Sequence, residues 1–240
     1  MTSRLLLRWI VTPTAGFTLG CACFLRPWPP TKDERLGTVT LKRPLEQQRH
    51  DVLAQIQNDP EYSALVANGD VHHFSQSEKI PHAHRDYHVG QGLLYGKGHL
   101  EIDPLLFHDL NTRELVVFYH LGHNLGNERG NVHKGIVALL MDEALCYCGF
   151  PTLPSKRGVT ARLDLTFAHD VPADSTVVLR ARVRETKGRK CVIDGTLESL
   201  PATRPWYNPW GPTKRTQIAS GTCILVEPKW FKHMSWFSAF

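Results

Sequence analysis

The chain has 240 residues, a formal net charge of +5 and a hydrophobic content of 42%. That length and that content are enough for one substantial folded domain with extensions. Basic residues are spread along the chain rather than gathered in blocks, so the charge gives no support to a nucleic-acid-binding protein. A mild positive charge is instead compatible with an anionic small molecule as partner.

The first 32 residues differ in composition from the rest. They contain Arg4, Arg8 and Arg26 and no acidic residue, because the first acid is Asp33. Such a basic, hydroxyl-rich and acid-free segment is typical of a mitochondrial presequence. The uncharged stretch at 9–25 is 17 residues long, the lower limit for a membrane span. We predict a mitochondrial leader at 1–32 and a matrix or inner-membrane protein; a membrane anchor and a secretory signal remain the alternatives.

The six cysteines do not form the pattern of a disulfide-bonded protein. Cys146 and Cys148 are two residues apart in a predicted helix, so their side chains point in nearly opposite directions and cannot pair. The other four are divided between the leader and two separate predicted strands. We expect six reduced thiols, which fits an intracellular compartment.

Residues 33–92 are predicted to form an N-terminal helical extension and a loop. Residues 45–67 have a helical period that Pro60 interrupts, which predicts two short helices. Residues 72–88 contain five histidines and are predicted to be a polar surface loop. The His-Ala-His at 82–84 has no third and fourth ligand in a familiar arrangement, so we predict no metal site.

From residue 93 onward the pattern is β-rich with one helix. Strands are predicted at 115–122 and 159–167, in a hairpin over 175–199 that turns at Lys187 and Gly188, and at 217–227; the helix is predicted at 135–149. The Pro-rich segment at 201–215 cannot lie inside a sheet and is predicted to be a long hairpin loop. In the strand at 159–167, strict alternation places Thr160 on the polar face, opposite Leu163 and Leu165.

The predicted helix at 135–149 is apolar nearly all round and must be buried on all sides. A strongly curved antiparallel sheet of five or six strands wrapped around this helix meets that requirement. The expected fold class is therefore α+β, with one central helix and an N-terminal helical extension.

The helix and the strands after it resemble a known family. GNVHKGIVALLMDEA (130–144) and the segment 158–199 that follows resemble the hotdog-fold acyl-CoA thioesterases. That group includes phenylacetate-pathway enzymes and the mitochondrial and cytosolic thioesterases of animals. The resemblance covers about 93–227, which implies a hotdog domain at 93–228 and a C-terminal tail at 229–240.

The family motif has a His-Gly-Gly at the start of the helix, an acid nine residues after the His, an Asn six before it, and a Ser or Thr on the next strand. Here His133, Asp142, Asn127 and Thr160 match those positions. Lys134 replaces the first glycine. A lysine still has a backbone N–H but removes the space and torsional freedom of glycine, so the change bears on substrate fit more than on the chemistry.

The resemblance implies a role for each of these residues. Asp142 activates water or attacks the thioester directly, and Thr160 positions the water or the acid. His133 orients the loop and hydrogen-bonds the substrate, and Asn127 binds the thioester carbonyl together with the backbone N–H of Lys134 or Gly135.

Those two residues, Lys134 and Gly135, are the expected oxyanion and substrate-binding positions. Glu143 is expected to make structural contacts rather than catalyse. Arg189 and Lys190 are candidates for holding the phosphates of coenzyme A.

The implied activity is hydrolysis of an acyl-CoA thioester to free acid and CoA, with no cofactor other than the CoA of the substrate. The implied assembly is a homodimer or tetramer in which Asn127 and His133 of one subunit face Asp142 and Thr160 of another. Two other functions stay open: a hotdog hydratase or dehydratase acting on acyl thioesters, and a non-catalytic protein that binds acyl-CoA or another partner.

Overall fold

The computed structural model describes residues 13–14, 16–17, 42–200 and 215–231. Nearly all of the predicted leader, the Pro-rich segment at 201–214 and the tail after residue 231 lie outside the described residues. Residues 40–240 form one compact unit, and the description below concerns that unit.

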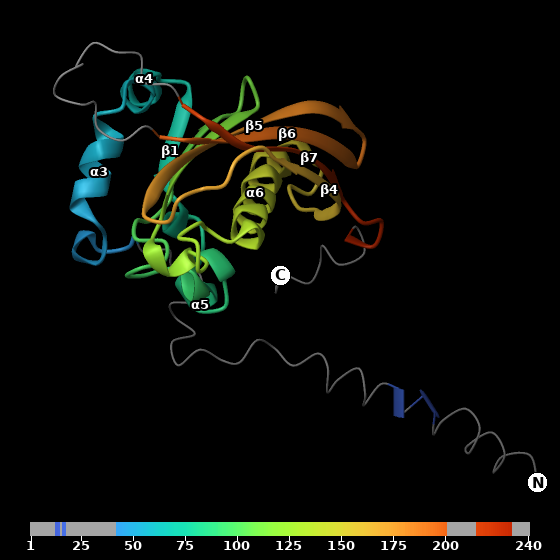
Figure 1. Cartoon of the computed structure of the whole chain (residues 1–240). Helices are drawn as coiled ribbons and strands as arrows, with labels where there is room; N and C mark the ends of the chain where they lie inside the picture. The colour runs from blue at the N-terminus through green and yellow to red at the C-terminus, as the bar shows by residue number, and fades with distance from the viewer. Residues whose placement is uncertain (1–12, 15, 18–41, 201–214, 232–240) are drawn as a thin grey trace, which may run out of the picture. The chain divides into compact units, whose positions relative to one another are not determined.

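The centre of this unit is a seven-stranded antiparallel sheet (Figure 1). The strands are β1 (Val71–Ser75), β2 (Leu105–Asp109), β3 (Glu114–Leu121), β4 (Val159–Phe167), β5 (Ser175–Lys187), β6 (Lys190–Ser199) and β7 (Gln217–Val226). Their order across the sheet is β1-β2-β3-β5-β6-β7-β4, so β1 and β4 are the two edge strands. The β5–β6 hairpin turns through Gly188, whose positive φ of 59° suits a glycine.

Along the chain, helices stand before the first strand and between later strands. They are α3 (His50–Gln57), α4 (Pro60–Ala67), α5 (His82–Arg85) and α6 (Lys134–Gly149), with single turns at Leu45–Gln47, Gln76–Glu78, Val89–Leu93, His123–Leu125 and Phe150–Thr152. The predicted break at Pro60 is confirmed, because this proline occupies the first turn of α4, where its missing N–H costs no hydrogen bond. The Asp59 side chain caps the same end by accepting from the Glu61 amide.

The long helix α6 lies against the concave face of the sheet and forms the main core with it (Figure 1). Met141 and Leu145 on the helix, and Ile193 and Leu225 on the sheet, are fully buried. A Cβ atom at Gly195 of β6 would lie 2.6 Å from the Leu145 side chain, so only glycine permits the helix to approach β6 this closely. This curved sheet around one helix confirms the predicted hotdog fold.

Among the described residues, one helical stretch, Lys134–Thr152, is long and apolar enough to cross a membrane. It contains α6, the core helix, so its apolar composition is explained by burial under the sheet.

A second, smaller core lies on the outer face of the sheet. Val52 and Ile56 of α3 pack there with Phe107 of β2 and Phe118 of β3. Tyr62 of α4 meets both phenylalanine rings edge-on, with ring centroids 5.4 and 6.0 Å away. The N-terminal helices therefore cover one part of the outer face and are integral to the fold.

The number of strands differs from the prediction of five or six. β1 lies inside the segment that was predicted to be a polar loop, and β2 was not predicted. His72 and His73 of β1 are both exposed, although successive residues of a strand point to opposite faces. This edge strand therefore carries solvent-exposed polar residues on both faces, and its sequence looks polar. β2 has only five residues, and so short an apolar run has no decisive period.

Candidate active site

Asp142 and Thr160 meet directly. The Thr160 hydroxyl on β4 donates a hydrogen bond of 2.9 Å to Asp142 Oδ1 on α6. A β-bulge between Thr160 and Arg162 makes this contact possible. Because the bulge adds one residue to β4, Thr160 turns toward the helix, on the same side as the partly buried Leu163. The prediction that Thr160 lies on the polar face was therefore wrong.

Two cysteines that were not predicted to belong to the site complete this cluster. The Cys146 thiol lies 3.1 Å from Thr160 Oγ1 and 3.9 Å from Asp142 Oδ1. Cys223 on β7 is fully buried beside it, and its hydrogen bond lowers the pKa of the Cys146 thiol. The i, i+4 spacing of Asp142 and Cys146 indicates a shared helix face, but only the sheet brings Cys223 to them. All four cysteines among the described residues are free.

His133 caps the N-terminus of α6. Its ring Nδ1 accepts a hydrogen bond of 3.0 Å from the Gly135 amide, so that amide is occupied within the chain. In the part of the chain that the structure describes, the Lys134 amide has no acceptor. It points from the helix N-terminus, where the helix dipole favours negative charge. Of the two expected oxyanion donors, the Lys134 N–H is the one left available.

The Lys134 side chain is held at the surface. Its ammonium lies 3.5 Å from an Asp170 carboxylate oxygen and 5.7 Å from the centre of the Phe167 ring. These contacts place the side chain near Phe167, the last residue of β4. The lysine in the His-Lys-Gly motif therefore keeps its backbone donor while its charge is engaged elsewhere.

Asn127 shapes the loop before α6. Its side-chain oxygen accepts from the backbone amides of Arg129 at 2.9 Å and Asn131 at 3.2 Å. This turn uses the side-chain oxygen and does not involve the side-chain NH₂ group.

The two functions of Asn127 can be separated by substitution. Asn127→Asp keeps the oxygen that accepts the two amides and removes the NH₂ donor. A hydrogen bond to a charged group contributes about 1.5–3 kcal/mol, so we expect kcat/KM for an acyl-CoA to fall by roughly 10- to 100-fold, with an unchanged melting temperature. Wild-type kcat/KM in Asn127→Asp would show that this residue only shapes the loop.

Within one chain, the two halves of the predicted site do not come together. His133 and Asp142 are nine residues apart along α6, which is roughly 13 Å along the helix axis. A carbonyl held at the helix N-terminus is therefore out of reach of Asp142 in the same chain. Asp142 instead meets Thr160 at β4, an edge strand whose single partner among the described strands is β7.

Glu143 contacts the N-terminal extension. Gln76 Nε2 lies 3.4 Å from its Oε2, and His88 Nε2 lies 3.8 Å from its Oε1. Burial raises the pKa of Glu143 to about 7, and the charge of Asp142 adds to the effect. The half-buried Glu143 is therefore a carboxyl group whose pKa the fold raises.

This raised pKa makes stability depend on pH. The folded state holds the Glu143 proton up to about pH 7, whereas the unfolded chain releases it near the ordinary glutamate pKa of 4.5. The unfolding free energy should therefore fall as pH rises between these values. Glu143→Gln should raise it by about 3 kcal/mol at pH 8 and leave it unchanged near pH 4. Urea unfolding at both pH values measures this, with the exposed Glu46→Gln as control; equal effects at both pH values would contradict it.

Arg189 and Lys190 lie at the β5–β6 hairpin. Lys190 is aligned with Val226 of β7, which is in turn aligned with Val159 of β4. The two basic residues are therefore at the same end of the sheet as Thr160, two strands away. The Arg189 guanidinium donates to the Glu227 carbonyl oxygen at 2.8 Å, while Lys190 is exposed.

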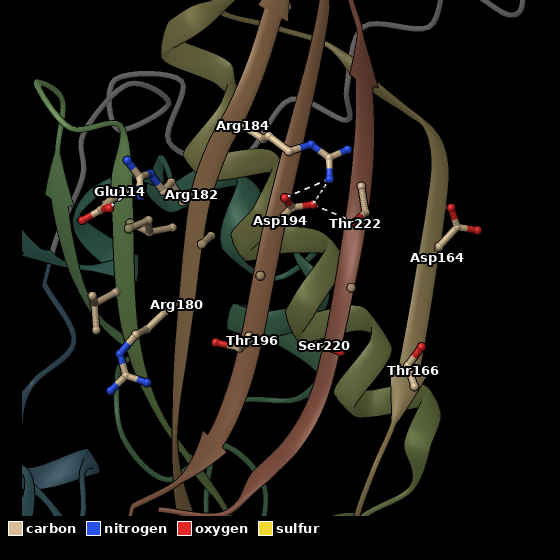
Figure 2. Close-up of a pocket in the computed structure, with 15 residues that line it drawn as sticks. Glu114, Asp164, Thr166, Arg180, Arg182, Arg184, Asp194, Thr196, Ser220 and Thr222 are labelled. Carbon is tan, nitrogen blue, oxygen red and sulfur yellow. Dashed lines mark hydrogen bonds and ion pairs between the residues drawn. The ribbon is translucent and has the colours of Figure 1, made fainter.

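A hollow of about 620 Å³ lies on the outer face of the sheet, away from α6 (Figure 2). Its cationic side chains are each paired: Arg184 with Asp194 at 3.1 Å and Arg182 with Glu114 at 3.4 Å. Arg180 pairs with acids of α4 and β6. Ion pairs with acids of neighbouring elements therefore explain these arginines, and the hollow offers no unpaired arginine to a ligand.

The chain resembles known proteins in sequence. A family model described as "Thioesterase superfamily" matches residues 129–203. A protein of Saccharomyces cerevisiae named "MIOREX complex component 3" is 51% identical over 261 residues, which covers 99% of this chain and 97% of the relative. An uncharacterized mitochondrial protein of Candida albicans is 42% identical and covers 94% and 95%. The mouse acyl-coenzyme A thioesterase THEM4 is 23% identical and covers 58% and 56%.

Proposed function

The chain belongs to the thioesterase superfamily, and from this premise we propose that it hydrolyses an acyl-CoA thioester to the free acid and CoA. The observation that carries the proposal is the contact between Asp142 and Thr160, made by a core helix and a bulged edge strand. A bulge that turns a hydroxyl toward a carboxylate is the kind of local irregularity that functional sites use.

The proposed chemistry divides between two groups of residues. Asp142 takes the proton of an attacking water, or attacks the thioester carbon itself, while Thr160 orients it. The carbonyl oxygen, which gains negative charge in the transition state, binds to the Lys134 amide and the Asn127 NH₂ group. Such donors are the largest single source of stabilisation in acyl transfer. The His133 cap keeps the helix N-terminus in place.

The proposed active unit is a homodimer with edge strand β4 at its interface. Pairing of two β4 strands covers an unpaired sheet edge and brings the helix N-terminus of one subunit toward Asp142 of the other. Each site then takes residues from both subunits. Light scattering at micromolar concentration should give a mass of at least twice that of the chain; a monomer would overturn this arrangement.

We place the protein in mitochondria. The basic, acid-free composition of residues 1–32 and the mitochondrial name of the Candida albicans relative support this. Residues 1–40 fused to a fluorescent reporter are expected to carry it into mitochondria, with residues 41–80 as the control fusion. A cytosolic or secreted reporter would show that the leader prediction is wrong.

The test of the activity is a thiol-release assay of the purified chain with acyl-CoAs of graded length, from acetyl to palmitoyl, and with phenylacetyl-CoA. Release of one thiol per thioester consumed supports hydrolysis. Hydration of crotonyl-CoA without thiol release would instead identify a hydratase.

A second candidate is a non-catalytic acyl-CoA-binding protein within a larger assembly. The name of the Saccharomyces cerevisiae relative refers to a complex, and Lys134 departs from the glycine of the family motif. In this case acyl-CoA raises the melting temperature of the protein while no thiol is released.

A further inference from the structure

The cluster around Asp142 has the composition of a metal site. Asp142 and Cys146 lie on one face of α6, and Cys223 faces them from β7. One carboxylate oxygen and the two sulfur atoms all lie within 4.8 Å of one another. The sequence predicts no metal here, because Cys223 is far from the other two along the chain.

The distances suit a small cation. Around a tetrahedral Zn²⁺ ion, with Zn–S of about 2.3 Å and Zn–O of about 2.1 Å, two sulfur atoms are about 3.8 Å apart and a sulfur and an oxygen about 3.6 Å apart. The three donors therefore need to contract by about 1 Å at most, which side-chain rotation provides. Three protein ligands leave a fourth position for water or another ligand.

The donor types select the metal. Two thiolates favour Zn²⁺ or Cd²⁺ over Mg²⁺ and Ca²⁺, which prefer oxygen ligands. On binding, each thiol releases its proton to solvent, and the local charge of two thiolates and one carboxylate is reduced from −3 to −1. Asp142 has no cationic partner among the described residues, since Lys134 on the same helix pairs with Asp170.

The surroundings of the ligands also fit. The Thr160 hydroxyl donates to Asp142 Oδ1, an arrangement in which an outer hydrogen bond orients a metal ligand. Cys223 has 0% of its surface exposed, whereas Asp142 and Cys146 are partly exposed and provide the side from which a cation enters.

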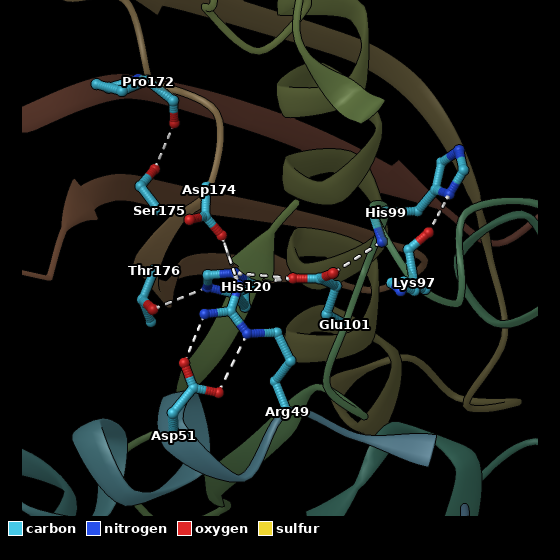
Figure 3. Close-up of polar contacts among 11 residues, drawn as sticks. Arg49, Asp51, Lys97, His99, Glu101, His120, Pro172, Asp174, Ser175 and Thr176 are labelled. Atoms are coloured by element: carbon cyan, nitrogen blue, oxygen red, sulfur yellow. Dashed lines mark hydrogen bonds and ion pairs between the residues drawn. The ribbon is translucent and has the colours of Figure 1, made fainter. Parts of the chain in front are cut away.

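A second cluster of potential ligands shows the contrast. Glu101, His120 and Asp174 also lie close together, but the Arg49 guanidinium is already among them (Figure 3). It donates to Glu101 at 2.9 Å and to Asp174 at 2.6 Å. The Arg49 guanidinium neutralises the charge of that cluster. No cationic side chain of the described residues does so for the cluster at Asp142.

We propose that Asp142, Cys146 and Cys223 form a binding site for one thiophilic divalent cation, with Zn²⁺ as the fitting ion. If the proposed hydrolysis is correct, the bound ion also inhibits it, because it occupies the carboxylate that serves as base. The binding itself does not rest on the proposed function.

The test titrates the purified, tag-free and reduced full chain with Zn²⁺ in a calorimeter and with Cd²⁺ in an ultraviolet spectrometer. One equivalent per chain and thiolate-to-cadmium charge-transfer absorption are expected. Loss of an outer-shell partner weakens metal sites by about 10- to 100-fold, so Cys223→Ser and Cys146→Ser should each weaken binding by at least about 100-fold. Cys191→Ser removes another buried thiol, on neighbouring β6, and should bind like wild type.

Metal-free melting temperatures of all three variants show whether each one is folded. No saturable binding by the wild-type chain, or equal binding by Cys223→Ser and Cys191→Ser, would overturn the proposal. Binding without any thioesterase activity in the metal-free chain would support the metal site and contradict the proposed hydrolysis, so the two failures are distinguishable.

Discussion

Replacing Asp142 with asparagine is expected to lower kcat for acyl-CoA hydrolysis by at least about 100-fold. One positioned acid–base group typically contributes about 10²–10⁴ in rate. Asparagine keeps the shape of the side chain and an oxygen that accepts from Thr160, but it cannot take a proton or attack the thioester. The variant should remain folded, because a partly buried charge is removed. Steady-state thiol release measures the effect, and circular dichroism checks the fold.

The neighbouring carboxylate provides the matched control. Glu143→Gln should keep most of wild-type kcat, since Glu143 contacts Gln76 and His88 of its own chain. An inactive Glu143→Gln variant and an active Asp142→Asn variant would show that Glu143, not Asp142, is the base. Near-wild-type rates in both variants would show that this site does not catalyse hydrolysis.

Two inactive variants should restore activity when they share a dimer. Asn127→Asp damages the carbonyl-binding half of the site, and Asp142→Asn damages the carboxylate half. If each site combines these halves from different subunits, a mixed dimer contains one site with both defects and one intact site. One intact site of two gives each isolated mixed dimer about half of wild-type activity.

The control for this experiment is the double variant Asn127→Asp/Asp142→Asn paired with wild type. Its mixed dimers carry one defect in each site, so all activity comes from the wild-type dimers. Co-expression with two different affinity tags isolates the mixed dimers for the measurement. Mixed single-variant dimers as inactive as their parents would place both halves of the site in one subunit.

The central helix and the long strands could be predicted because their physical signals are local. The helix at α6 is apolar nearly all round, and β3, β5, β6 and β7 are runs of 8 to 13 residues. β1 could not be predicted in this way, since an edge strand with two exposed, consecutive histidines resembles a loop. The short β2 carries too few residues for its period to be distinguished.

The sequence by itself determined which residue types stand at the helix N-terminus and nine residues later, because His133 and Asp142 belong to one continuous segment. Only the tertiary structure decided how Thr160 is aimed, since an extra residue in β4 reverses the face of a strand without changing its composition. It also decided which groups surround each of the two adjacent carboxylates. Asp142 and Glu143 are adjacent in sequence and point about 100° apart around the helix, so their environments depend on what the rest of the chain packs against each side. Cys223 joins the cluster for the same reason: sheet pairing brings together residues that the chain keeps far apart.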